Sequence, residues 1–98
     1  MSAKFQKIVK KIRPLFKPYR IQYLGLFGSM ARGTAKKNSD IDLLVKFKNP
    51  PGLIEYIRLE EALAKTLGRK VDLVSMGGIS PEIKPYITGD LVTLYENR

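Results

Sequence analysis

The stretch GLFGSMARGTAKKNSDIDLLV, residues 25–45, decides the fold because it joins two apolar runs through a segment rich in glycine and serine. The apolar run over residues 21–27 predicts a buried strand, and the run over 41–47 predicts a second strand. Between them, residues 29–33 can form a short helix that is capped by Ser29 and closed by Gly33. Strand, short helix and strand therefore form the centre of the predicted fold.

Apolar residues at helical or alternating spacing, bounded by proline or glycine, predict the other elements. These elements are a helix over residues 5–16 that bends or stops between Pro14 and Pro18, a helix over 53–67 ended by Gly68, a strand over 70–76, a short helix over 81–87 and an edge strand over 91–95. This order predicts an α/β (α+β) fold with a single mixed sheet. The chain of 98 residues is long enough for one core, so we expect residues 1–98 to form one domain.

The composition limits the chemistry that the chain can perform. It has no cysteine and no histidine, which excludes a disulfide, a thiolate, an imidazole base and an ordinary zinc site. Catalysis would have to use carboxylates, lysines, hydroxyls, backbone amides or a metal held by oxygen. Because no run approaches the roughly 18 to 20 apolar residues of a membrane span, and no signal peptide is recognisable, we expect a cytoplasmic protein without a membrane partner.

The net charge of +9 is unevenly distributed along the chain. Residues 1–39 contain ten lysines and arginines and no acidic residue, whereas the other 59 residues contain eight basic and nine acidic residues. The N-terminal region is therefore expected to attract an anion, such as a nucleic acid, a nucleoside triphosphate or an acidic protein. An equally good interpretation is that its lysines form the solvated face of an amphipathic helix.

Two aspartates alternate at the start of the predicted strand over residues 41–47. Side chains alternate along a strand, so Asp40 and Asp42 point to the same side, with Cα atoms roughly 6.5 to 7 Å apart. Neighbouring carboxylates favour a raised pKa or a bound cation, and oxygen ligands favour Mg²⁺ or Mn²⁺. An adjacent strand would bring Asp72 to the same place. Alternatively, the aspartates are outward-facing residues on a solvated sheet.

A possible phosphate site precedes the aspartates. Gly28 at a strand end lets the backbone approach a phosphate closely, and the following helix start offers unpaired N–H groups. Ser29 adds a hydroxyl, and Arg32, one turn later, can bring a positive charge to the same anion. The alternatives are that Ser29 only caps the helix and that Arg32 is only a surface charge.

Together, the segments GSMARGTAKKNSDIDLLV and GRKVDLVSM resemble the signature of the DNA polymerase beta-like nucleotidyltransferases, and more narrowly that of the minimal nucleotidyltransferases, the MNT family. The resemblance covers nearly the whole chain and implies a nucleotidyltransferase fold like the palm of polymerase beta. The positions that match the motif are Gly28, Ser29, Arg32, Gly33, Ser39, Asp40, Asp42 and Asp72.

The resemblance implies a role for each matched position. Asp40 and Asp42 would hold two Mg²⁺ ions, with Mn²⁺ as a possible substitute, and Asp72 would complete the second metal site or act as the base. Gly28, Ser29 and Ser39 would bind the nucleotide phosphates, and Arg32 would support the phosphates or the loop of the site. The implied reaction moves AMP from ATP to an acceptor and releases pyrophosphate.

The family resemblance also implies a partner. In the MNT family the partner is a helical HEPN protein, a toxin, and the MNT chain acts as the antitoxin by transferring AMP to a tyrosine of that partner. A homo- or hetero-oligomer is therefore expected. The alternative is a non-catalytic binding module that neutralises a partner by contact, or binds RNA through its basic N-terminal helix.

Overall fold

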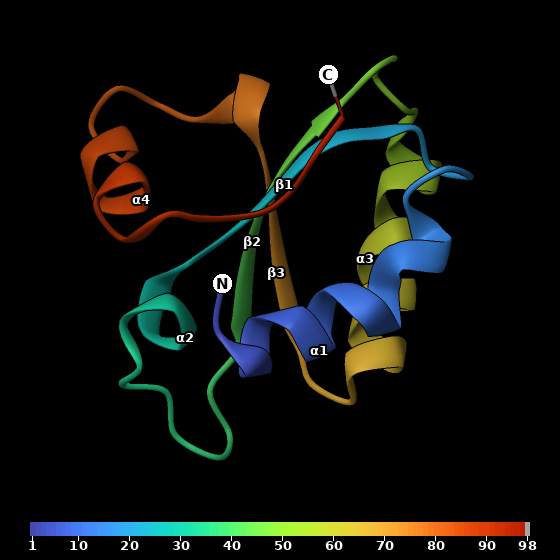
Figure 1. The fold of residues 1–98 in the computed structure, drawn as a ribbon. Coiled ribbons are helices and arrows are strands. Elements are labelled where there is room, and N and C mark those ends of the chain that lie inside the picture. Colours follow the sequence, from blue (N-terminus) through green and yellow to red (C-terminus); the bar gives the residue numbers. More distant parts are fainter. Residues whose placement is uncertain (98) are drawn as a thin grey trace.

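The computed structural model describes residues 1–97 and contains a four-stranded sheet in the order β3-β2-β1-β4 (Figure 1). The central strand β1 (Ile21–Phe27) pairs antiparallel with β2 (Ile41–Phe47) and with β4 (Val92–Glu96). The strand β2 pairs parallel with β3 (Val71–Ser75). The prediction of one mixed sheet is confirmed.

Helices lie on both sides of this sheet. In Figure 1, α1 and α3 lie together on the right, whereas α4 lies on the left and α2 follows the end of β1. The helical elements are α1 (Ala3–Ile12), the 3₁₀ turn Arg13–Leu15, α2 (Gly28–Arg32), α3 (Leu53–Leu67), the 3₁₀ turn Met76–Gly78 and α4 (Lys84–Asp90). Within residues 1–97, none of these helices is long and apolar enough to cross a membrane.

The main core lies between the sheet and the pair α1 and α3. Its fully buried side chains come from all of these elements and include Ile12, Leu24, Leu43, Leu59 and Leu63. Because side chains alternate along a strand, the residues of β2 next to Leu43 face the other side of the sheet. A smaller cluster forms there, where α4 covers the opposite face, so β2 is buried on both faces over part of its length.

The smaller cluster consists of Tyr23, Leu44 and Ile87. Leu44 shares its face of the sheet with Asp42, two residues earlier. The cover provided by α4 buries Leu44 to 2% exposure but leaves Asp42 only partly buried. Asp42 therefore lies at the edge of the surface that α4 covers, where its carboxylate can reach solvent.

Two predicted helix starts are wrong. Gly28 adopts φ +75° and turns the chain directly from β1 into α2, so the helix begins at Gly28 and Phe27 takes the N-cap position. Ser29 therefore lies inside the first turn and does not cap the helix. The helix predicted over residues 81–87 instead spans Lys84–Asp90, since Pro85 lacks an N–H and fits best in a first helical turn.

The free edge of β3 is covered by side chains of α3. The backbone N–H of Leu73 donates to Glu60 Oε2 at 2.9 Å, and the Tyr56 hydroxyl donates to the carbonyl oxygen of Leu73 at 2.6 Å. Tyr56 and Glu60 are four residues apart and so lie on one face of α3. These two hydrogen bonds satisfy the backbone N–H and carbonyl groups of Leu73, which could otherwise pair with a strand of another chain.

Tyr56→Phe tests the edge contact. The pKa of Tyr56 is raised from its ordinary value of 10 to about 12. Burial is the largest cause, followed by the negative charges of Glu60 and Asp72. A raised pKa means that the contribution to stability is present below pH 10 and is lost as the pH rises through 12. We expect the variant to lower the free energy of unfolding by about 1 kcal/mol at neutral pH.

The difference between wild type and Tyr56→Phe should shrink as the pH rises from 10 to 12 in urea denaturation experiments. Tyr86→Phe is the matched control, because the Tyr86 side chain is 79% exposed and its hydroxyl should contribute little. A difference that stays constant across this pH range would contradict the proposed role of the Tyr56 hydroxyl.

Candidate functional site

Asp42 and Asp72 lie directly opposite each other on neighbouring strands. The parallel register of β2 and β3 pairs Asp42 with Asp72, so the two side chains emerge from the same face of the sheet. Neighbouring strands are about 4.8 Å apart, which brings the two carboxylates close together. Asp42 is partly buried and Asp72 is exposed.

The charges around Asp42 oppose its ionisation. Burial contributes most to raising the pKa of Asp42 above its ordinary range, followed by the negative charges of Asp72 and Asp40, while Arg32 acts in the opposite direction. Asp40 lies one residue before β2, and its carboxylate Oδ2 is 3.9 Å from Lys70 Nζ. We call Asp40, Asp42 and Asp72 the acidic group; Asp40 and Asp42 are partly buried and Asp72 is exposed.

Gly28 lies against the carboxylate of Asp42. A Cβ atom at Gly28 would collide with Asp42 Oδ2 and would lie 3.1 Å from its Cγ. The φ of +75° is also a conformation that residues with a side chain rarely adopt. The turn from β1 into α2 therefore requires glycine for two reasons, and it brings free backbone next to the carboxylate.

The two serines have different surroundings. Ser29 lies in the first turn of α2, where backbone N–H groups lack partners within the helix. Ser39 instead accepts a hydrogen bond from the backbone N–H of Lys36 at 2.8 Å, and its own N–H donates to the Lys36 carbonyl at 3.0 Å. Ser39 thus closes the loop that leads into Asp40, and Gly33, with φ +79°, ends α2 as predicted.

Arg32 connects α2 to α4. Its Nη1 donates to Asp90 Oδ2 at 2.7 Å, and the two side chains are 50% and 25% exposed. Asp90 is not predicted from the sequence, because 58 residues separate the two partners and no local pattern marks it. The position of α4 relative to the acidic group therefore depends partly on this ion pair.

A cavity of about 550 Å³ opens beside the acidic group. Its lining includes Gly28, Arg32 and Asp72. Most of its other lining residues are apolar, and they include Ile83 and Tyr86, which are 54% and 79% exposed. A molecule in this cavity would therefore meet both charged groups and apolar side chains.

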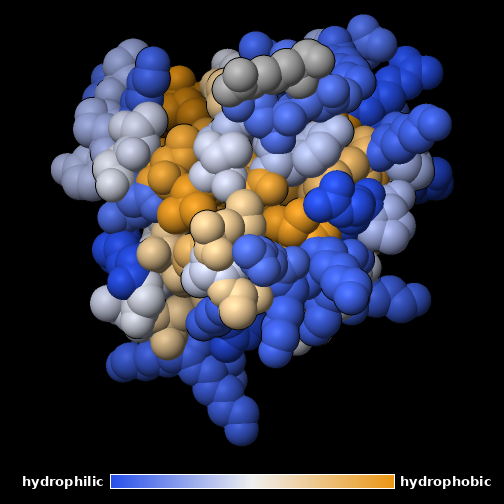
Figure 2. Space-filling view, in the orientation of Figure 1, coloured by the Kyte–Doolittle hydropathy of each residue, from blue (hydrophilic) through white to orange (hydrophobic). Residues whose placement is uncertain are grey.

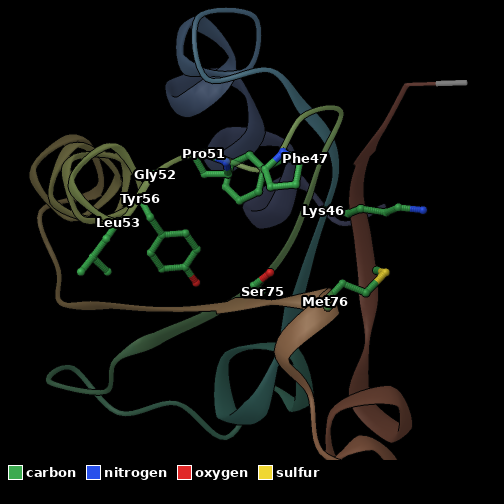
Figure 3. A pocket seen from close by; sticks show the side chains of 10 residues that line it. Lys46, Phe47, Pro51, Gly52, Leu53, Tyr56, Ser75 and Met76 are labelled. Atoms are coloured by element: carbon green, nitrogen blue, oxygen red, sulfur yellow. The ribbon is translucent and has the colours of Figure 1, made fainter.

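A second cavity, of about 570 Å³, lies near the far end of β2 (Figure 3). Its lining includes Phe47, Leu53, Tyr56 and Met76, and Figure 3 shows the amine of Lys46 extending away from Tyr56. The strand rise places Lys46 about 13 Å from Asp42 along β2. Among the described residues, no aspartate or glutamate lines this cavity, so the carboxylates of the candidate site are associated with the first one.

The donor atoms of the acidic group suit a hard divalent cation. Asp40, Asp42 and Asp72 supply only carboxylate oxygens, the ligands that Mg²⁺ and Mn²⁺ prefer. A cation would also relieve the repulsion that raises the pKa of Asp42. Among residues 1–97, no three acidic side chains are already gathered into a complete metal site, so water or phosphate oxygens would have to supply further ligands.

The chain is similar in sequence to a known protein family and to characterised relatives. The family described as polymerase beta, nucleotidyltransferase matches residues 10–98. The protein adenylyltransferase MntA of Thermococcus cleftensis is 39% identical over 74 residues, which cover 76% of this chain and 75% of that protein.

Solved structures show the same arrangement of elements. A chain in the crystal structure of a toxin-antitoxin with AMP-PNP superposes on this chain with a TM-score of 0.78 at 30% sequence identity. The match covers 91% of this chain and 73% of that chain. A chain in the structure of a tri-AMPylated Shewanella oneidensis HEPN toxin in complex with MNT antitoxin has a TM-score of 0.73 at 25% sequence identity. That match covers 95% of this chain and 73% of the other chain.

Asp42→Asn tests the electrostatics of the acidic group. The raised pKa means that ionisation of Asp42 opposes folding, so stability is greatest below the ordinary value of 3.8 and decreases as the pH rises through the raised pKa. The neutral amide should therefore stabilise the metal-free protein near neutral pH. We expect a gain below about 1 kcal/mol, because solvent screens a partly exposed group.

Thermal unfolding in the presence of a chelator measures this gain, which should vanish on acidification below the ordinary value of 3.8, where the carboxylate is protonated in both the folded and the unfolded protein. Asp90→Asn, which weakens the Arg32 ion pair, is the control and should not stabilise the protein. A lower melting temperature of Asp42→Asn at neutral pH would contradict the electrostatic interpretation.

Proposed function

Because this chain belongs to the polymerase beta nucleotidyltransferase family, we propose that it is a protein adenylyltransferase that moves AMP from ATP to a tyrosine of a helical HEPN-type toxin and so acts as the antitoxin of the pair. The observation that carries this proposal is the in-register pair of Asp42 and Asp72 beside the glycine turn, at the mouth of a cavity. Phosphate and carboxylate ligands of one cation would meet at this point.

The residues of the site divide into those that bind the nucleotide and those that hold the cation. Gly28 and Ser29 offer backbone N–H groups and a hydroxyl to the outer phosphates of ATP. Asp40 and Asp42 hold Mg²⁺, or Mn²⁺ in its place. When bound, the metal pair neutralises charge on the phosphates and on the entering and leaving oxygens.

The transfer forms one bond and breaks one. The tyrosine oxygen of the acceptor attacks the α-phosphorus of ATP, and the bond from that phosphorus to the bridging oxygen breaks, so pyrophosphate leaves. Asp72 is exposed beside the cavity, where it takes the proton of the acceptor hydroxyl or completes the metal site. The acceptor reaches Asp72 from solvent, because Asp72 is exposed.

The apolar side of the cavity positions the reactants. Ile83 and Tyr86 present an exposed apolar wall that a ring of the nucleotide or of the acceptor can pack against. Arg32 is already held by Asp90, so it supports the site by fixing α4 as well as by lowering the negative potential. Ser39 closes the loop before Asp40 and thereby supports the phosphate-binding turn indirectly.

The transfer is tested with ATP labelled at the α-phosphate. We expect Mg²⁺-dependent labelling of the toxin partner by the wild-type protein. Asp42→Asn should lose the labelling but remain folded, because the neutral amide removes an unfavourable charge. A partner in which tyrosines are replaced by phenylalanine identifies the acceptor. Mass spectrometry of the partner should show the added AMP.

A contact-only antitoxin gives a different result. In that case the partner would carry no label, yet the unlabelled complex would still block its toxicity, and Asp42→Asn would neutralise the toxin as well as the wild-type protein does. Either result would replace the transfer mechanism by neutralisation through binding.

Gly28→Ala and Gly68→Ala separate the steric role of Gly28 from backbone strain. Both glycines have positive φ, +75° and +68°, so each variant should lose about 1 to 2 kcal/mol of stability. Only at Gly28 does the new Cβ meet the carboxylate of Asp42, whereas the space around Gly68 is open. We therefore expect at least about a 100-fold loss of AMP transfer in Gly28→Ala alone.

Labelling rates and urea denaturation, measured on both variants, check this prediction. Equal losses of activity in Gly28→Ala and Gly68→Ala would show that general destabilisation, rather than contact with Asp42, explains the requirement for glycine at position 28.

A further inference from the structure

A group of positively charged side chains lies beside α1 and is centred on residues outside the acidic group. Lys4, Lys7 and Lys11 follow one another along one face of this helix and, together with Arg69, line a shallow cavity of about 220 Å³. A helix rises 1.5 Å per residue, so the three lysines extend over about 10 Å. Residues along the length of α1 and from the turn after α3 thus present charge to the same place.

Arg69 also holds a second basic segment in place. Its Nη2 donates to the carbonyl oxygen of Lys36 at 3.0 Å and to that of Lys37. The loop carrying these two lysines is therefore tied to the turn that carries Arg69 and Lys70. We call this set the basic patch; it consists of Lys4, Lys7, Lys11, Lys36, Lys37, Arg69 and Lys70.

Little negative charge offsets the basic patch. All of its residues except Arg69, which is partly buried, are exposed. In the described part of the chain, the only ion pair of the patch joins Lys70 to Asp40 at 3.9 Å. Figure 2 shows hydrophilic side chains over the lower and right-hand parts of the face that carries α1. The charge is therefore available to an anion from solvent.

We propose that the basic patch binds the phosphate backbone of a nucleic acid duplex. Duplexes carry one negative charge per about 1.7 Å of length, so a patch of this extent meets several phosphates at once. Lysines provide point charges that suit phosphate contacts, and such contacts carry no direct sequence information. This activity is independent of AMP transfer and uses none of the residues assigned to it.

The chemistry of the patch favours nucleic acid over a protein partner. Protein interfaces depend on buried apolar or aromatic anchors. The large hydrophobic residues exposed on the described chain are Met1, Leu53, Ile54, Ile57, Ile83 and Tyr86, and none belongs to the patch. The patch also lacks an aromatic ring on which an unpaired base could stack, which favours a duplex over a single strand.

Fluorescence anisotropy with labelled duplexes of about 20 base pairs, one of RNA and one of DNA, tests the proposal on the full chain. We expect micromolar affinity and a logarithmic salt slope of about −3 to −4, which corresponds to roughly a 100-fold loss between low and physiological salt. The variant with Lys4→Gln, Lys7→Gln and Lys11→Gln should reduce the slope by about three.

The control variant carries Lys46→Gln, Lys48→Gln and Lys84→Gln. These lysines are exposed and lie outside the patch, and their replacement changes the net charge equally. Equal loss of binding in both variants, or a flat salt dependence, would overturn the proposal. Loss of toxin binding with unchanged duplex binding in the patch variant would instead assign the patch to an acidic protein. Asp42→Asn should bind duplexes like wild type, which keeps this test separate from AMP transfer.

Discussion

The close approach of the Gly28 backbone to the Asp42 carboxylate is the constraint on which the candidate site depends. This approach requires β1 and β2 to pair so that Phe27 lies opposite Asp42. Only this register places the last residue of β1 beside the second residue of β2. It also requires a backbone turn with positive φ and no side chain at position 28. The antiparallel pairing of two buried strands therefore determines where phosphate and carboxylate ligands can meet.

The rest of the fold supports this contact against an unfavourable charge distribution. Burial and the neighbouring carboxylates oppose the ionisation of Asp42, so the site is electrostatically strained without a cation. The buried leucines of β2, packed on both faces of the sheet, hold the strand in register despite this repulsion. Meanwhile α3 covers the edge of β3, and the Arg32–Asp90 ion pair fixes α4 beside the cavity.

The molecule separates two kinds of charge over a short distance. The acidic group consists of Asp40, just before β2, and of Asp42 and Asp72 near the starts of β2 and β3, and the basic patch consists of lysines and Arg69 from α1, the loop before Asp40 and the turn before β3. The two regions meet at the ion pair between Lys70 and Asp40. This separation is the basis of our two proposals, that the basic patch attracts a polyanion and that the acidic group binds divalent cations.

The sequence by itself determined the elements of this protein and the types of residue in its site. Alternation over residues 41–47 and the glycines at 28 and 33 identified the strand, the turn and the end of α2, because these patterns report local backbone geometry. Local patterns also misplaced the cap at Ser29 and the start of α4, where positive φ at Gly28 and the missing N–H of Pro85 outweighed general preferences. Only the tertiary structure decided that Asp72 stands opposite Asp42 and that Asp90 holds Arg32 across 58 residues. Register between distant strands and contacts between helices follow from packing against a shared core, and no periodicity along the chain encodes them.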